Sequence, residues 1–224
     1  MNLEPLQARH LRTVLRLRPG DAVEAFDDAG HTAPAVVTAA TPEKVTIRIE
    51  RVVDAPLAEF AWTIAAALPK GQRADWMVEK LAELGTAVFV PLITERSVTH
   101  PAGREKTARW ARLASEASRQ SGRAGVMRIE PLTPLAQFIA GRDNLRHLSP
   151  PPESQPITQM IVEKRPTTLT MLIGPEGGWT AEELTTLAAR GSIAVRLAQS
   201  VLRVETAAVA AAAIAAAWAA NHQS

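Results

Sequence analysis

The sequence of 224 residues contains no cysteine, and its histidines do not form a recognisable metal-binding pair. Without cysteine, structural disulfides and thiolate metal sites are excluded, and the composition suits a reducing compartment. His10 and His147 lack the spacing of two metal ligands. We therefore expect no bound metal.

Long apolar runs and targeting segments are also missing. The longest apolar run, residues 206–220, is nearly all alanine and is shorter than the roughly 20 residues that a membrane span needs. We interpret it as a packed helix whose small side chains let neighbouring backbones come close. Residues 1–5 have neither the basic start nor the apolar stretch of a signal peptide. We expect a cytoplasmic protein that does not enter a membrane.

Charge of one sign is not in excess, since 25 Lys+Arg stand against 23 Asp+Glu for a formal net charge of +2. The basic residues are nevertheless concentrated in two segments, which suit contact with phosphate groups. The N-terminal segment holds Arg9, Arg12, Arg16 and Arg18, and the central one holds Arg104, Lys106, Arg109, Arg112, Arg119, Arg123 and Arg128. A solvated helix face is the alternative for the central segment. Neither Gly-x-x-x-x-Gly-Lys-Ser/Thr nor Gly-x-Gly-x-x-Gly occurs, which disfavours a nucleotide-phosphate enzyme.

Residues 1–55 have the pattern of a small β domain. Residues 22–26 and 35–37 are strand-like and flank a turn signal at 27–30. Residues 44–51 alternate polar and apolar side chains strictly, as a half-buried strand does. We expect a small β-barrel followed by a linker near residue 55.

In residues 56–224, strands alternate with helices, which predicts a parallel sheet covered by helices on both faces. The expected strands are residues 60–68, 88–92, 126–129, 168–173 and 193–197. The expected helices are residues 75–84, 105–119, 135–139, 181–189 and 206–220. The proline-rich segment 147–156 is expected to be irregular.

Two loops near the C-terminus look like parts of one site. The first, Gly174-Pro175-Glu176-Gly177-Gly178, ends an apolar run. It precedes a capping-box pattern, in which Thr180 is the N-cap of a helix and Glu183 is its partner three residues later. The second, Leu202-Arg203-Val204-Glu205-Thr206, opens the last helix. Open α/β sheets bind ligands at the carboxyl ends of their strands. Both loops are expected there.

These residues resemble the RsmE family of ribosomal RNA uridine-N3 methyltransferases, which belongs to the SPOUT superfamily. Further matches are Arg9-His10-Leu11, Pro19-Gly20-Asp21, the segment 79–85 with Glu-Leu-Gly at its end, Thr94-Glu95-Arg96-Ser97 and Gln120-Ser121-Gly122-Arg123. The resemblance implies a knotted (trefoil), mostly parallel SPOUT sheet in residues 56–224 and a PUA-like RNA-binding β-barrel in residues 1–55. It also implies S-adenosylmethionine as cofactor, methylation of uridine N3 in the decoding region of small-subunit (16S) ribosomal RNA, and a homodimer that buries the last helix.

Candidate site residues follow from these motifs. For the cofactor they are Leu172, Ile173, Gly174, Pro175, Gly177, Gly178, Leu197, Leu202, Thr206 and Ala207. For RNA they are Arg9, Arg12, Arg16, Arg96 and Arg123. For catalysis they are Arg203, Glu205 and Glu176, with Glu205 favoured as the base that removes the weakly acidic N3 proton.

Alternatives stay open for several of these residues. Glu205 could instead cap the last helix together with Thr206, and the glycines could serve only to make turns. Trp179 lines a pocket in one interpretation and packs in the core in the favoured one. Where the family has Leu-Gly-x-Arg, this chain has Leu197-Ala198-Gln199-Ser200. Ala198 and Ser200 keep open a non-catalytic RNA-binding or ribosome-assembly factor. A SPOUT enzyme with another RNA target is a further alternative, against which the Glu-Leu-Gly and Thr-Glu-Arg-Ser motifs argue.

Overall fold

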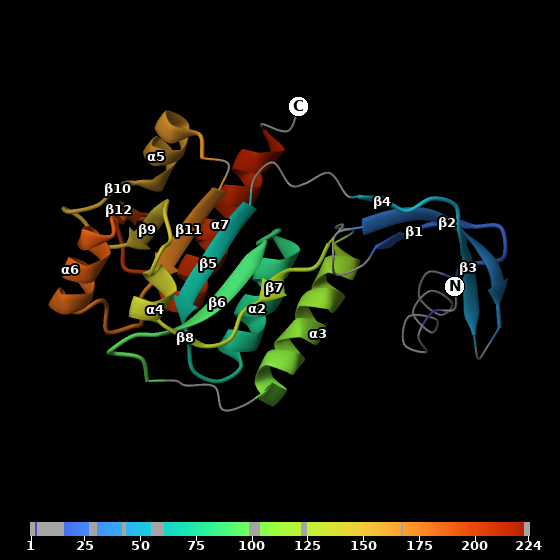
Figure 1. Cartoon of the computed structure of the whole chain (residues 1–224), viewed down its shortest axis with the longest axis horizontal. Coiled ribbons are helices and arrows are strands. Elements are labelled where there is room, and N and C mark those ends of the chain that lie inside the picture. The colour runs from blue at the N-terminus through green and yellow to red at the C-terminus, as the bar shows by residue number, and fades with distance from the viewer. Residues whose placement is uncertain are drawn as a thin grey trace. The chain divides into compact units, whose positions relative to one another are not determined.

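A computed structural model describes residues 3, 16–26, 31–41, 44–54, 61–98, 104–121, 125–166 and 168–221. The chain divides into two compact units, Met1–Leu57 and Ala58–Ser224, whose elements are labelled in Figure 1. Three of the candidate RNA-binding residues, Arg9, Arg12 and Arg123, lie outside the described residues.

The first unit contains an antiparallel sheet built around one long strand. Its strands are β1 (Ala22–Phe26), β2 (His31–Ala40), β3 (Val45–Ile49) and β4 (Val53–Asp54). Strand β2 pairs with the other three. Ala35 and Val37 of β2 meet Val45 and Ile47 of β3 in a small buried cluster. The alternating sequence of β3 therefore forms a half-buried strand, as predicted.

The second unit is built on an eight-stranded sheet with the order β10-β12-β9-β11-β5-β6-β7, in which β8 pairs with β6 and every pairing is parallel. Its strands are β5 (Ala61–Ala67), β6 (Val88–Ile93), β7 (Arg128–Ile129), β8 (Thr133–Pro134), β9 (Leu145–Leu148), β10 (Gln155–Pro156), β11 (Thr168–Ile173) and β12 (Ile193–Arg196). The near-continuous apolar sequences of β5 and β11 are typical of parallel strands that are buried on both faces.

Helices cover both faces of this sheet (Figure 1). They are α2 (Arg73–Glu83), α3 (Arg104–Gln120), α4 (Leu135–Ile139), α5 (Ile157–Lys164), α6 (Ala181–Ala189) and α7 (Val204–Ala220). Because side chains alternate along a strand, Ile64 of β5 joins the core formed with α2, α3, α5 and α7, whereas Ala65 joins the core formed with α4 and α6. The predicted parallel sheet with two covered faces is confirmed.

Local sequence explains where two of the helices begin or end. Helix α2 buries one stripe that includes Met77, Val78 and Leu81, and it ends before Gly85, whose φ of 88° suits the residue that follows a helix. Helix α6 begins at the predicted capping box: Thr180 Oγ1 accepts the Glu183 backbone N–H, and Glu183 Oε2 accepts the Thr180 N–H.

The expectation of an irregular segment at 147–156 was wrong at both ends. Strand β9 covers Leu145–Leu148 and β10 covers Gln155–Pro156. The polar pair Arg146-His147 does not fit the apolar pattern expected of a buried strand. The strand forms because β9 lies between β11 and β12 and is hydrogen-bonded to both. Helix α5, which has no counterpart among the sequence predictions, buries Ile157, Met160 and Ile161. Strand β7 is shorter than expected, and the trefoil knot stays a prediction.

None of the helices in the described part of the chain is long and apolar enough to cross a membrane.

Candidate active site

The parallel pairing brings four loops to one edge of the second unit's sheet. Ile173, the last residue of β11, pairs beside Ala66 near the end of β5. The "glycine loop" (residues 174–180) follows β11, and the "arginine loop" (residues 197–203) follows β12. Loops 68–72 and 94–98 follow β5 and β6 at the same edge. The prediction that both signature loops follow carboxyl ends of strands is confirmed.

The glycine loop folds back on itself around Trp179. A Cβ at Gly174 would lie 2.9 Å from the Trp179 indole, and Trp179 Nε1 donates to the Leu148 carbonyl at 2.9 Å. Trp179 also packs against the core beneath α4 and α6, so the favoured core interpretation is confirmed. Gly178 has a φ of 70°, which disfavours any other residue. The loop's own conformation therefore already requires glycine at 174 and 178.

Loop 94–98 holds the glycine loop from its other side. Arg96 Nη1 donates to the Gly177 carbonyl at 2.7 Å and to the Trp179 carbonyl at 3.4 Å. Glu183 Oε1 accepts the backbone N–H of Glu95 at 2.9 Å, so one carboxylate joins the capping box to this loop. Arg96, a candidate for RNA contact, is exposed and supports the glycine loop in addition.

Glu205 lies in the first turn of α7 and is only 6% exposed. Its Oε1 accepts a hydrogen bond from Arg73 Nη1 at 3.3 Å. Its Oε2 is buried and has no hydrogen-bond partner within the described residues. The N-cap of α7 is Arg203, whose side chain makes no capping bond. Glu205 is therefore paired with a distant arginine and also lies in the first helical turn, where an acid is favoured.

Arg73, Glu176 and Glu205 form a cluster of charged side chains, and Arg73 is the member that the sequence analysis missed. Besides Glu205, its Nη1 lies 3.5 Å from Oε1 of Glu176 in the glycine loop. A signal was available, because Lys70-Gly71-Gln72-Arg73 places two cations and a glycine directly after an apolar strand. Its partner could not be predicted, since 132 positions separate Arg73 from Glu205.

The remaining cofactor and catalytic candidates lie at the end of β11, in the same two loops and in the first turn of α7. Leu172, Ile173 and Ala207 are buried, whereas Pro175, Leu197 and Leu202 are half-buried. Glu176, Gly177, Gly178, Arg203 and Thr206 are exposed. Arg16 is exposed in the first unit. The structure thus places the cofactor and catalytic candidates along one edge of a sheet, with exposed main chain in the glycine loop.

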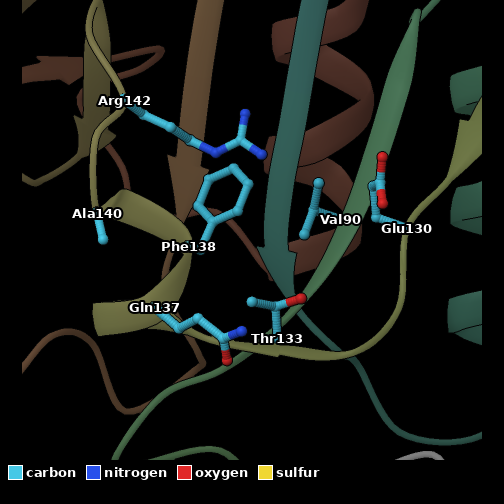
Figure 2. Close-up of a pocket in the computed structure, with 7 residues that line it drawn as sticks. All are labelled: Val90, Glu130, Thr133, Gln137, Phe138, Ala140 and Arg142. Carbon is cyan, nitrogen blue, oxygen red and sulfur yellow. The ribbon is translucent and has the colours of Figure 1, made fainter.

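A hollow of about 200 Å³ lies elsewhere in the second unit and is drawn in Figure 2. Its lining comes from β6, α4 and neighbouring segments: Val90, Glu130, Thr133, Gln137, Phe138, Ala140 and Arg142. The Arg142 guanidinium lies 4.4 Å from the centre of the Phe138 ring, and Figure 2 shows the side chain extending over that ring. The hollow contains none of the predicted site residues.

Among the described residues, no group of three or more His, Asp or Glu side chains could hold a metal ion.

Two protein-family models match the chain along nearly its whole length. The RNA methyltransferase domain matches residues 57–216, and the RNA methyltransferase PUA domain matches residues 6–50. Ribosomal RNA small subunit methyltransferase E from Synechocystis is 30% identical over 212 residues, with 92% of this chain and 69% of the relative covered. The chain belongs to the ribosomal RNA small subunit methyltransferase E family. The resemblance inferred from the motifs is confirmed.

Solved structures of similar proteins agree with this assignment. Ribosomal RNA small subunit methyltransferase E from Neisseria gonorrhoeae, bound to S-adenosylmethionine, has a TM-score of 0.80 at 27% identity, with 96% of this chain and 90% of that chain covered. A probable rRNA methyltransferase from Porphyromonas gingivalis has a TM-score of 0.84 at 26% identity, with 99% and 94% covered. The predicted class, a mostly parallel SPOUT sheet after a PUA-like domain, is confirmed.

Proposed function

We propose that this chain methylates N3 of a uridine in small-subunit (16S) ribosomal RNA, in the decoding region, with S-adenosylmethionine as methyl donor. The observation that carries the proposal is the buried carboxylate of Glu205 in the first turn of α7, whose Oε2 has no hydrogen-bond partner among the residues that the structure describes. Membership of the family supports the substrate class. A relative with the methyl donor bound supports the cofactor.

The residues at this edge fit the methyl donor. The glycine loop exposes Gly177 and Gly178, which carry no side chain of their own that would cover the main chain at these positions. Backbone groups of both loops can therefore approach an adenosine closely, and such positioning is the main task of the protein in methyl transfer. We assign donor binding to these residues: Leu172, Ile173, Gly174, Pro175, Gly177, Gly178, Leu197, Leu202, Thr206 and Ala207.

The side chains of the cluster can move the proton that the reaction requires. Glu205 Oε2 accepts the proton of N3–H as that bond breaks, and the electron pair stays on N3. When bound, S-adenosylmethionine supplies the methyl group to this pair, and the electrons of the broken C–S bond remain on sulfur. Glu205 then releases its proton to water. A positioned base typically contributes ~10²–10⁴-fold, and the exposed Arg203 can stabilise negative charge on the uracil ring or bind a phosphate.

We further propose that the arginines named above contact the RNA backbone. Arg9, Arg12 and Arg16 belong to residues 1–55, which we take as the RNA-binding domain, and Arg96 and Arg123 belong to residues 56–224. Phosphate contacts of this kind give affinity without reading sequence. We also propose that the protein acts as a homodimer in the cytoplasm.

The experiment is methylation in vitro followed by mass mapping of the RNA. Purified chain and S-adenosylmethionine are mixed with free 16S ribosomal RNA and, separately, with small subunits from cells that lack this protein. The proposal expects one new methyl group, on N3 of one uridine in the decoding region. A methyl group on a ribose or another base would favour the alternative of a different RNA target.

A matched pair of variants tests the role of Glu205. Glu205→Gln should lower the turnover rate by ~10²–10⁴-fold and leave the affinity for S-adenosylmethionine nearly unchanged. Glu163→Gln, an exposed acid on α5, should behave like the wild type. If the wild type neither binds the donor in a calorimetric titration nor transfers a methyl group, the alternative of a non-catalytic RNA-binding factor is favoured instead.

A further inference from the structure

We infer that Arg73 is a positioning residue of this site, which fixes the carboxylate of Glu205 so that its second oxygen faces the substrate. The inference rests on the proposed function, because it assigns Glu205 the role of the base. Arg73 reaches the site from α2, a helix that contains none of the candidate residues.

The topology of the second unit brings Arg73 to this place. Strands β5 and β11 are hydrogen-bonded neighbours, so the loops that follow them begin side by side. Arg73 is the first residue of α2, directly after the loop that follows β5. Helix α2 also packs against α7, whose first turn carries Glu205. Arg73 therefore stands at a helix start that is adjacent to both the glycine loop and Glu205.

One nitrogen of Arg73 contacts two acids of the cluster. Nη1 lies 3.3 Å from Glu205 Oε1 and 3.5 Å from Glu176 Oε1. The side chain of Glu176 is 55% exposed, so its contact with Arg73 is weakened by water. The side chain of Glu205 is only 8% exposed. Arg73 is consequently more important for Glu205, because a buried carboxylate depends on a cation or hydrogen-bond donors for its charge.

The same contact engages only one oxygen of Glu205. Oε1 is occupied by Arg73, whereas Oε2 is buried and has no partner among the described residues. Buried polar atoms without a partner are rare in folded proteins, and a catalytic role is one of the explanations for them. Without Arg73, the carboxylate would be free to rotate or to take up a proton, and Oε2 would no longer be held ready for N3–H.

A purely structural tie between α2 and α7 is the competing explanation, and turnover, donor affinity and stability together distinguish the two. The variants are Arg73→Ala, Arg73→Lys, Glu205→Gln and the double variant Arg73→Ala/Glu205→Gln. Arg190→Ala, an exposed arginine after α6, is the control. The measurements are the turnover rate and KM on 16S ribosomal RNA, the Kd for S-adenosylmethionine by calorimetry, and the midpoint of urea unfolding.

Arg73→Ala should lower the turnover rate by about 10- to 100-fold, a part of what a positioned base contributes, and leave the Kd for S-adenosylmethionine within about threefold. Arg73→Lys should restore most of the rate, since the positive charge returns. In the Glu205→Gln background, Arg73→Ala should change the rate by less than about twofold, because the group that Arg73 positions is already lost.

Three results would overturn the inference. One is Arg73→Ala turning over within about twofold of the wild type. Another is a further large loss of rate when Arg73→Ala is added to Glu205→Gln. The last is an Arg73→Lys variant that has wild-type stability but turns over as slowly as Arg73→Ala. If Arg73→Ala does not fold, a stable but slow Arg73→Lys variant overturns the inference by itself.

Failure of the proposed function would look different. In that case the wild type itself would not methylate the RNA, and only the unfolding midpoints would report on the pair. Arg73→Ala should then lower the midpoint of the wild type but not that of Glu205→Gln, whose side chain carries no charge. Equal losses in both backgrounds would show that Arg73 does not act on Glu205.

Discussion

Arg146 is a buried cation with no carboxylate partner in the part of the chain that the structure describes. It is 7% exposed on β9, and its Nη1 donates to the carbonyl of the neighbouring Leu145 at 2.8 Å. Its Nε has no hydrogen-bond partner within the described residues. Burial lowers the pKa of the Arg146 guanidinium below its ordinary range. A guanidinium in this position destabilises the fold, since its hydration is lost and not replaced by an acid.

Arg146→Met should therefore raise the free energy of unfolding, on the order of 1–3 kcal/mol, which is the usual penalty for a buried polar group left without its partner. Methionine fills a similar space with apolar atoms. Urea unfolding measures the change, and Arg190→Met, at an exposed position, serves as the control. A variant less stable than the wild type would mean that Arg146 contributes favourable interactions that outweigh its burial.

His147 predicts how stability depends on pH. It is 6% exposed, its Nδ1 lies 2.9 Å from Ser192 Oγ, and burial lowers the pKa of His147 below 6.5. The unfolded chain therefore binds this proton at a higher pH than the folded chain. His147 contributes full stability above pH 6.5, and this is lost as the pH falls from 6.5 toward the folded-state pKa.

Urea unfolding of the wild type between pH 7.5 and about 5 should show this loss of stability. The loss should be smaller in His147→Asn, because asparagine keeps a hydrogen-bonding group near Nδ1 but does not titrate. Identical pH dependence in the two proteins would assign the effect to other groups.

The glycine loop shows what single residues in a sequence can and cannot reveal. The motif correctly predicts a turn after an apolar strand, and a site there stays a proposal. Close approach of a ligand is one possible reason for glycine at 174, but the Trp179 indole alone already disfavours a Cβ there. Contacts over long sequence distances, such as Trp179 with Leu148 or Arg73 with Glu205, have no signature in local sequence.

At the scale of elements, the stability of helix α6 and the conformation of the site depend on the same residues. Thr180 and Glu183 form the capping box, and Glu183 also holds the backbone of Glu95. Thr180 directly follows Trp179, which closes over Gly174. Fraying of the first turn of α6 would therefore release both the glycine loop and loop 94–98.

Thr180→Ala should lower the free energy of unfolding by about 1 kcal/mol, the usual cost of losing an N-cap side chain. It should also weaken binding of S-adenosylmethionine, since the glycine loop loses its support. Thr185→Ala, which removes an exposed hydroxyl that donates to Ala181 O in the same helix, should do neither. Unfolding and calorimetry check both effects. Unchanged donor affinity in Thr180→Ala would separate the cap from the site.

Elements with strong periodicity were predictable from sequence, and elements defined by their neighbours were not. The alternation of β3, the apolar run of β11 and the buried stripe of α2 each match a local rule. Strand β9 does not, because Arg146 and His147 form a strand only once β11 and β12 supply partners on both sides. Tertiary pairing decided this element against its local preference.

For the whole molecule, the site depends on strand order more than on any motif. Strands β5 and β11 are adjacent although about a hundred residues separate them along the chain, and β12 joins the same sheet through β9. A parallel sheet of this order places the ends of these strands at one edge. Sequence alone predicted the parallel sheet, but the order of its strands comes from the structure.

The predicted homodimer can be tested on the last helix. Ala213 and Ala217 lie one turn apart on α7 and are exposed in the single chain, and small residues allow close approach of another helix. Sedimentation of the wild type should give about twice the 24.1 kDa mass of one chain. Ala217→Glu should shift the protein toward the single-chain mass, because it would bury a charge.

Ala188→Glu, an exposed alanine on α6, should leave the association unchanged. A wild type that sediments as a single chain at all concentrations tested would contradict the dimer.

The central claim is that the glycine loop and the arginine loop form one binding site for the methyl donor beside Glu205. The most direct measurement is a crystal structure of the chain with S-adenosylmethionine. The account predicts the donor against the backbone of residues 174–178 and 197–202, with its methyl group facing Oε2 of Glu205. A donor bound elsewhere, for instance in the hollow beneath Arg142 and Phe138, would contradict it.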